Sequence, residues 1–476
     1  MHWGHPLNRI SLRGASFDRL RTQIALVAGS TAIGQILVTA SAPLIARLFT
    51  PADFGVSAGY SFLLMLLLAV NSLRYEFAIP LPKSDAEASN LTALTISLVV
   101  GLSILFTALV WGFADQITRL LNEPRLRELL PLLPVGLIIG GVLLALNYWL
   151  TRRKQFAPLS LIQLSSNIGQ VSAQIIAGVA HMGAFGLALS FMVGQFIACV
   201  IALRRTLPLP DVQPRTWLPL AREYKNFPLF TTAASLVDIA GTNLPAVLFL
   251  AYFSATEAGY FSLTMRLMTL PASLISNAVA QVIYPRLSEA REDKLALRAL
   301  FLNIATALLI LSLAGFGFVL VAGGQLFSIV LGELWRASGV YAQILAPFFL
   351  ISFISSPLST LSLVFERQKV GLAFSVIVTV LRVAALLLSA LTNSPEVGVA
   401  LFSLTSFIIY VVYLVWLLHL ADLRLSDWLW SLRGLIALNG LLILAGFMLS
   451  NTPFVLLVGI GFAAVALFYV RKVNLS

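Results

Sequence analysis

The sequence predicts an all-α integral membrane protein with about 14 transmembrane helices. Its 476 residues are 59% apolar and only 11% charged, whereas soluble domains average roughly 45–50% and 25%. So few charged side chains cannot cover a water-exposed surface, and the chain divides into apolar segments of about 20 residues joined by short connections. Lipid is therefore the expected solvent, and the net charge of +11 is expected to set membrane orientation rather than to bind nucleic acid.

The first half of the chain is expected to form a basic leader and six spans. Residues 1–22 carry four arginines, and the apolar run that follows is too long for the core of a cleaved signal peptide. We therefore expect a cytoplasmic leader before an uncleaved first helix. An N-terminal lobe is predicted over 23–203, and the hydrophilic stretch 204–226 is expected to be a cytoplasmic linker. The six predicted spans are residues 23–46, 55–80, 89–113, 130–150, 157–179 and 183–203.

The second half is expected to form another lobe of six spans over 227–419, followed by two further helices within 433–470. No stretch between these spans is long enough for a separate soluble domain. The predicted spans are residues 227–252, 257–284, 299–322, 338–364, 370–391, 396–419, 433–450 and 453–470.

Two internal sequence similarities, called echoes below, support the division into lobes. Residues 48–55 are similar to residues 252–259, and residues 150–155 are similar to residues 363–368. Both echoes pair spans that are six apart, so the lobes are expected to share one orientation and to be related by a parallel pseudo-two-fold axis. In the first echo the aligned pairs are Phe49 with Phe253, Thr50 with Ser254, Asp53 with Glu257 and Gly55 with Gly259.

The distribution of basic residues predicts the orientation. With the N-terminus in the cytoplasm, 23 of the 31 Lys and Arg residues fall at cytoplasmic ends and loops, and five fall in outer loops. An even number of spans then places both termini in the cytoplasm. Three arginines remain within the spans.

Five charged residues lie inside predicted spans, where a charge at the bilayer centre costs about 2.5–3.5 kcal/mol on insertion scales. They are Arg74, Glu76, Asp238, Arg266 and Arg382. Three cations exceed two anions, so converging arginines would form a cationic cavity suited to phosphate oxygens. The alternative is that the arginines form structural ion pairs with Asp238 or Glu76. Arg74 and Glu76 are two apart, about 200° around a helix, and are not expected to face each other. Asp238 and Glu76 are also candidates for ion coupling.

Uncharged polar side chains recur at helical spacing in several spans. Their alternative role is to join helices by hydrogen bonds, but four amides on the fifth span exceed what packing needs. We expect these stripes to contact sugars. The residues are Gln35 in the first span, Gln163, Asn167, Gln170 and Gln174 in the fifth, and Ser262 and Asn277 in the eighth.

Several chemistries are not expected. The chain has no GxxxxGK[ST] phosphate loop, no HExxH motif and no Cys/His cluster, so we expect no ATP hydrolysis, metal site or cofactor. Its single cysteine, Cys199, cannot form an intrachain disulfide. The outer loops are too short to carry the catalytic groups of a glycosyltransferase, and no catalytic residue is expected.

Two stretches carry a family resemblance. Residues 48–55 (LFTPADFG) and 73–88 (LRYEFAIPLPKSDAEA) resemble the N-terminal pattern of polysaccharide-exporter (Wzx-type) flippases, within the multidrug/oligosaccharidyl-lipid/polysaccharide transporter superfamily. Segment count, loop lengths and the two-lobe repeat extend the resemblance over nearly the whole chain. It implies a bacterial inner-membrane protein whose two six-helix lobes form a V that opens to one side at a time.

The resemblance also implies a substrate, an O-antigen or exopolysaccharide repeat unit linked to undecaprenyl pyrophosphate. We expect Arg74, Arg266 and Arg382 to hold the pyrophosphate while the polar stripes contact the sugars and the prenyl tail stays in membrane lipid. A polysaccharide polymerase and a chain-length regulator are candidate partners. Two alternatives stay open, an ion-coupled multidrug antiporter of the same superfamily and a polysaccharide polymerase.

Overall fold

A computed structural model describes residues 29–448 and 452–474. These residues form helices joined by short turns, and no β-strand occurs among them. The chain divides into two compact units. Within the described residues, the first unit comprises the chain up to Phe49 and Gly59–Asn243, and the second comprises Thr50–Ala58 and the chain from Leu244 onward. The helices α3 and α11 each continue from one unit into the other.

The first unit contains the helices that surround the polar site described below. Its first span, Gly29–Leu48, includes α2 (Ala42–Leu48). The elements that follow are α3 (Pro51–Asn71), η1 (Tyr75–Ala78), α4 (Asp85–Gly112), α5 (Ala114–Leu120), α6 (Leu126–Leu129), η2 (Leu130–Leu132), α7 (Leu133–Arg152), α8 (Phe156–Val179), α9 (Gly183–Thr206), η3 (Pro214–Thr216), α10 (Trp217–Glu223), η4 (Phe227–Thr231) and α11 (Thr232–Tyr252).

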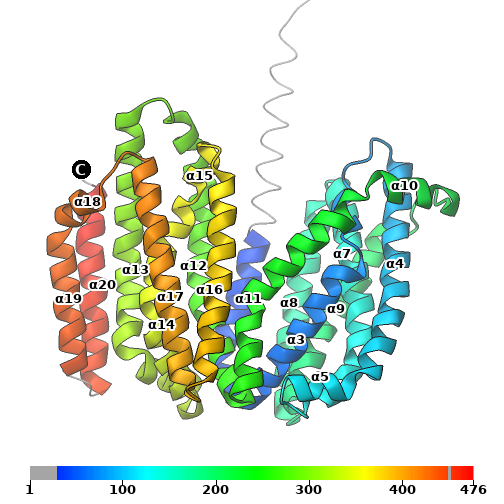
Figure 1. The fold of residues 1–476 in the computed structure, drawn as a ribbon, viewed down its shortest axis with the longest axis horizontal. Coiled ribbons are helices and arrows are strands. Elements are labelled where there is room, and N and C mark those ends of the chain that lie inside the picture. The colour runs from blue at the N-terminus through cyan, green and yellow to red at the C-terminus, as the bar shows by residue number, and fades with distance from the viewer. Residues whose placement is uncertain (1–28, 449–451, 475–476) are drawn as a thin grey trace, which may run out of the picture. The chain divides into compact units, whose positions relative to one another are not determined.

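The second unit is built around α13 and α14, which pack along each other and are covered by neighbouring helices. The C-terminal helices α19 and α20 pack on α13 (Figure 1). Its elements are α12 (Ala255–Glu289), α13 (Lys294–Leu331), η5 (Glu333–Trp335), α14 (Arg336–Leu358), α15 (Thr360–Val364), α16 (Gln368–Ala390), α17 (Pro395–Leu420), α18 (Leu425–Ser431), α19 (Arg433–Met448) and α20 (Thr452–Asn474).

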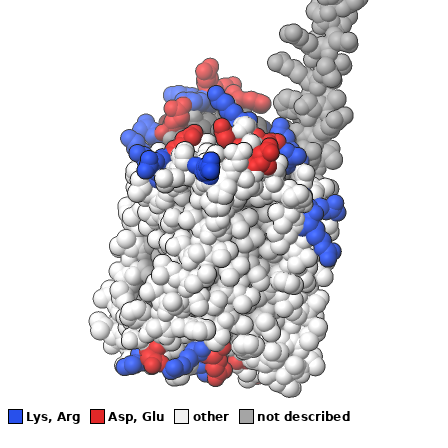
Figure 2. Space-filling model, turned by 90° about the vertical axis from the view of Figure 1, so that its right-hand side faces the viewer, with Lys and Arg blue, Asp and Glu red and all other residues white. Residues whose placement is uncertain are grey.

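The helices have the lengths that a bilayer requires. Ten in the described part of the chain are long and apolar enough to cross a membrane, or eleven if α18 and α19, which are bent by 71°, form one span. Each of the 14 predicted segments overlaps a helix. Helix α8 is long enough to span but falls outside the ten, because its polar side chains lower its mean hydropathy. Figure 2 shows that charged side chains on the face of the first unit gather mainly at its two ends, with a largely uncharged belt between them. The chain is therefore a multi-pass, all-α membrane protein.

The first sequence echo corresponds to two matching helix starts. Thr50 caps α3. Its hydroxyl accepts a hydrogen bond from the backbone amide of Asp53, and the Asp53 carboxylate accepts one from the backbone amide of Thr50. Ser254 caps α12 with its hydroxyl, which accepts a hydrogen bond from the backbone amide of Glu257 at 3.1 Å. The aligned glycines then make reciprocal close approaches between these two helix starts. A Cβ on Gly55 would lie 1.8 Å from the Ala255 carbonyl oxygen, and a Cβ on Gly259 would lie 1.7 Å from that of Pro51.

Candidate functional site

The polar site of the first unit begins where α3 ends. This helix stops at Asn71, and the backbone turns through Leu73 and Arg74, whose φ angles of 50° and 58° lie in the left-handed region. The short helix η1 (Tyr75–Ala78) follows. The prediction of one continuous helix over 55–80 is therefore wrong at its C-terminal end, because the chain leaves helical geometry before Arg74.

This turn creates an ion pair between Arg74 and Glu76. Their Nη1 and Oε1 atoms lie 3.3 Å apart, so the expectation that the two side chains do not face each other is wrong. Only 13% of the Arg74 side chain and none of that of Glu76 is exposed. The guanidinium also lies over the Phe77 ring, 5.6 Å from its centroid. The pair carries no net charge, and Arg74 Nε and Glu76 Oε2 are buried without a hydrogen-bond partner.

Neighbouring side chains fix the turn from both sides. The Asn71 amide donates a hydrogen bond to the carbonyl of Leu137 at 3.0 Å and accepts one from the Ser103 hydroxyl at 3.2 Å. On the other side of the turn, the Tyr75 hydroxyl donates to the carbonyl of Ala221 at 2.9 Å. The turn that carries Arg74 is therefore held by contacts of Asn71 and Tyr75 to α4, α7 and α10.

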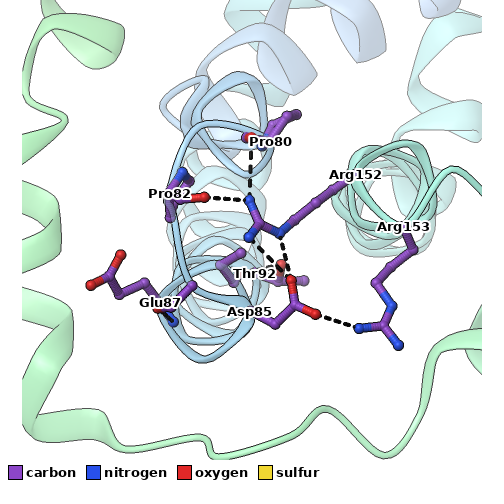
Figure 3. A network of polar contacts seen from close by, with 9 residues as sticks. Pro80, Pro82, Asp85, Glu87, Thr92, Arg152 and Arg153 are labelled. Carbon is purple, nitrogen blue, oxygen red and sulfur yellow. Dashed lines mark hydrogen bonds and ion pairs between the residues drawn. The ribbon is translucent and has the colours of Figure 1, made fainter. Parts of the chain in front are cut away.

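A second network clamps the loop between η1 and α4 (Figure 3). Arg152, at the end of α7, donates from Nη1 to the carbonyl oxygens of Pro80 and Pro82 at 3.2 and 2.6 Å. Its Nε and Nη2 atoms also donate to the Asp85 carboxylate, at 3.2 and 3.1 Å. Arg153 completes the network by pairing with the other oxygen of Asp85, at 2.5 Å. The network ties the loop to the end of α7.

The predicted linker 204–226 folds onto the same end of the first unit. The Ser89 hydroxyl donates to the Pro210 carbonyl at 2.5 Å. The Asn90 amide donates to the carbonyl of Asp211 at 2.8 Å and accepts from the backbone N–H of Gln213 at 2.6 Å. The linker therefore packs on α4 rather than hanging free between lobes.

A cavity of about 510 Å³ lies among α3, α7, α8 and α9, with Arg74 and Ile239 also in its wall. Its volume falls in the range of about 300–1,000 Å³ that is usual for small-ligand pockets. We call it the amide pocket, because five carboxamides and one hydroxyl line it. These polar residues are Asn147, Gln163, Ser166, Asn167, Gln170 and Gln195.

The polar side chains of the amide pocket have no protein partners within the part of the chain that the structure describes. Among the described residues, none of the six makes a side-chain hydrogen bond, and Asn147 Oδ1 is completely buried without a partner. Burying an unpaired polar group costs about 1–3 kcal/mol. The accessible polar groups that line the cavity without partners are therefore available to water or to a ligand.

The structure brings together part of the predicted sugar-contacting set. Gln163, Asn167 and Gln170 line the amide pocket, whereas Gln174, although on the same helix, is buried and lies outside its lining. Gln35 is half-buried in the first span and is also not in the lining. Ser262 belongs to the second unit, where its hydroxyl donates to the Gly259 carbonyl at 3.1 Å. The side chain of Asn277 lies outside the described residues.

Three polar residues of the pocket were not predicted, namely Asn147, Ser166 and Gln195. Asn147 and Gln195 are each the single carboxamide in an otherwise apolar predicted span, 130–150 and 183–203. A lone amide in a span is a usable signal, because such a group needs a partner or a cavity. Ser166 lacks such a signal, since serine is common in transmembrane helices.

Arg382, in the second unit, sits in an aromatic cage. Its guanidinium carbon lies 4.8 Å from the centroid of Phe402, 4.9 Å from that of Phe348 and 5.9 Å from that of Tyr410. Its Nε donates to the Ser406 hydroxyl at 2.7 Å, and its Nη2 atom is buried without a partner. Cation–π contacts thus replace an acidic partner for this arginine.

Arg266 and Asp238 are both exposed. Within the described residues of the second unit, Arg266 has no ion pair or hydrogen bond, and within those of the first unit Asp238 has no ion pair. Because Arg74 and the other two arginines belong to different units, the single cationic cavity stays a prediction. In the described part of the chain, no group of three or more His, Cys, Asp or Glu side chains could hold a metal ion.

Comparison with known sequences gives a family match. Residues 44–340 match the model of a family described as "Polysaccharide biosynthesis protein". The chain is 22% identical over 399 residues to the lipopolysaccharide biosynthesis protein WzxC of Escherichia coli K12, covering 80% of this chain and 75% of that protein. It is also 22% identical over 258 residues to the succinoglycan biosynthesis transport protein ExoT of Rhizobium meliloti, covering 53% and 50%.

Solved structures share the fold at low sequence identity. The lipid II flippase MurJ, in an inward closed conformation, is similar with a TM-score of 0.74 at 14% identity, covering 94% of this chain and 99% of that one. An inward-facing multidrug resistance MATE family transporter of the MOP superfamily has a TM-score of 0.60 at 14% identity, covering 83% and 94%. These similarities agree with the predicted architecture of about 14 spans in two lobes followed by two helices.

Proposed function

Because the chain belongs to the polysaccharide biosynthesis protein family, we propose that it is a flippase for a lipid-linked oligosaccharide in the bacterial inner membrane. The substrate is an O-antigen or exopolysaccharide repeat unit on undecaprenyl pyrophosphate, moved by alternating access from the cytoplasmic to the outer leaflet. The roles that the names of WzxC and ExoT give them, in lipopolysaccharide and in succinoglycan biosynthesis, support this class of substrate.

The amide pocket is the observation that carries the proposal. It places five carboxamides and a hydroxyl without protein partners inside a membrane-spanning unit. Polar groups at this depth are expensive and usually mark a substrate pathway. Hydroxyl-rich sugars are the part of the proposed substrate that matches such groups.

The three arginines contribute differently to this proposal. Arg266 is the strongest candidate for the pyrophosphate, because it is exposed and lacks a partner in the described part of its unit. Arg382 has one free Nη2 inside its aromatic cage, and Arg74 is already neutralised by Glu76. We retain all three as candidate substrate contacts, with the prenyl tail in lipid. Asp238, rather than the paired Glu76, is the better candidate for ion coupling.

The orientation and the organisation of the chain complete the proposal. We place both termini and the 204–226 segment in the cytoplasm, on the basis of the Lys and Arg distribution. Two lobes over 23–203 and 227–419 move against each other, with the helices of 433–470 as an addition. A polysaccharide polymerase and a chain-length regulator are proposed partners, because they act on the flipped repeat unit.

A multidrug antiporter of the same superfamily is the main alternative, supported only by fold similarity to MATE transporters. Cationic drugs favour acidic and aromatic cavities. The amide pocket contains no carboxylate, since its single charged lining residue is Arg74. The composition of the pocket therefore favours an oligosaccharide.

Deletion of the gene tests the proposal. We expect loss of surface polysaccharide and accumulation of the lipid-linked repeat unit in the cytoplasmic leaflet, both restored by the wild-type gene. Single repeats exposed on the outer leaflet would instead indicate a polymerase, and drug sensitivity with normal polysaccharide would indicate an antiporter. Arg266→Ala is expected to reduce export at least tenfold, whereas Arg367→Ala in a cytoplasmic loop serves as the matched control.

A further inference from the structure

The amide pocket differs from an anion site in its charge. Arg74 is its one charged lining residue, and Glu76 neutralises that guanidinium from 3.3 Å. A pyrophosphate in this pocket would lie in a low-dielectric region with no net positive charge to offset its own. The pocket is therefore suited to an uncharged ligand.

The pocket offers many hydrogen-bonding groups, and they include both donors and acceptors. Each of its five carboxamides offers two N–H donors and one carbonyl acceptor. Sugar hydroxyls also donate and accept, so one ring can pair with several amides at once. An apolar or cationic drug would leave most of these groups unsatisfied, at about 1–3 kcal/mol for each buried group.

The pocket is also complete within one unit. Every lining residue, from Met65 on α3 to Ile239 on α11, belongs to the first unit. Asn167 is further confined by the first span, since a Cβ on Gly34 would lie 2.0 Å from its Nδ2 atom. The amides are thus positioned by helices of the first unit.

We propose that the amide pocket is a subsite for uncharged sugar residues of the transported oligosaccharide, and that the pyrophosphate binds elsewhere. This inference rests on the proposed flippase function. It assigns Arg74 to the sugar subsite as a lining residue neutralised by Glu76, instead of to the anion site. Selection among glycans then depends on hydrogen bonds from α7, α8 and α9.

Binding by the purified full-length protein tests the subsite. Two ligands are compared by native mass spectrometry, bare undecaprenyl pyrophosphate and the lipid-linked repeat unit that the deletion strain accumulates. The wild type is expected to bind the glycosylated lipid at least tenfold more tightly. The double variant Asn167→Leu with Gln170→Met preserves side-chain size but removes the amides. It should lose about tenfold in affinity for the glycosylated lipid and bind bare undecaprenyl pyrophosphate as the wild type does.

Matched variants make each outcome decisive. Gln155→Met, at the start of the same helix but outside the pocket lining, should keep the wild-type preference, and Arg266→Ala should weaken binding of both lipids. If the double variant retains the full preference for the glycosylated lipid, the pocket holds only water and the inference is overturned. If the wild type binds neither lipid and the deletion strain accumulates none, the proposed function itself fails. Gln163→Met, at an exposed side chain, repeats the test should the double variant not fold.

Discussion

The ion pair of Arg74 and Glu76 affects both the stability of the protein and the charge of the amide pocket. Glu76 is fully buried and Arg74 nearly so. Removing one partner of a buried pair leaves an uncompensated charge, which typically costs about 3–5 kcal/mol. Replacing both partners by neutral groups costs less, because no charge remains buried.

We therefore predict that Glu76→Gln lowers the free energy of unfolding by about 3–5 kcal/mol, and that adding Arg74→Gln recovers part of this loss. Unfolding of the purified protein in mixed micelles measures both changes. The control is Glu333→Gln, which breaks an exposed pair with Arg336 and should leave the free energy of unfolding nearly unchanged, because water and salt screen such a pair. Equal losses for Glu76→Gln and Glu333→Gln would show that breaking the buried pair destabilises the protein no more than breaking an exposed one.

Sequence reasoning at this scale identifies the charged residues in the apolar region but not their geometry. Arg74 and Glu76 were identifiable as charges in an apolar region, yet helical spacing placed them apart. Leu73 and Arg74 have left-handed φ angles, but neither is a Gly or Asn, the residues that usually indicate this conformation in a sequence. These φ angles are imposed by distant partners of Asn71 and Tyr75, and such tertiary contacts offset the cost of about 1–3 kcal/mol for strained backbone.

At the scale of elements, helix positions were predictable because the bilayer fixes their length and apolar character. The stripe on α8 was predictable for the same reason, since amides are rare in lipid. The end of α3 at Asn71 was not, because it lies well before Pro80 and because proline alone does not end a membrane helix in this chain: α11 continues through Pro245. Asn147 on α7 and Gln195 on α9 line the same pocket as Gln163. This grouping depends on the packing of three helices, which periodicity within one helix does not contain.

The crossing of α3 and α12 gives a prediction for an element pair. Gly259→Ala places a Cβ within 1.7 Å of the Pro51 carbonyl oxygen, and Gly55→Ala places one within 1.8 Å of that of Ala255. Because backbone atoms cannot give way as a flexible side chain does, each variant should lose about 1–3 kcal/mol of stability. The thermal unfolding midpoint of the purified protein measures this.

A third glycine provides the control for that experiment. A Cβ added to Gly371, within α16, would meet no atom within 4 Å. Gly371→Ala should therefore leave stability unchanged or raise it by up to about 1 kcal/mol, because alanine favours helix. An equal fall in all three alanine variants would contradict a specific role for the close crossing of α3 and α12.

At the scale of the whole molecule, charge distribution and function depend on the same orientation. In the orientation that we propose from the 23-to-5 division of basic residues, the Arg152 network and the folded 204–226 segment lie on the cytoplasmic side. In that orientation Arg74 and Glu76 lie toward the cytoplasmic end of the first unit, where the proposed substrate is made. An inverted protein would present this end of the amide pocket to the wrong leaflet.

Site-directed labelling therefore tests the orientation, starting from Cys199→Ala, which removes the single, buried cysteine. In this background, Gln116→Cys adds an exposed thiol on α5, and Arg205→Cys adds one at the end of α9. A maleimide that crosses the outer but not the inner membrane should label position 116 in intact cells and position 205 only after permeabilisation. Export by each variant shows that it is folded. The reverse labelling pattern would contradict the orientation. Equal labelling of both positions would contradict a single fixed topology, because opposite helix ends can face the same compartment only if the chain inserts in both orientations.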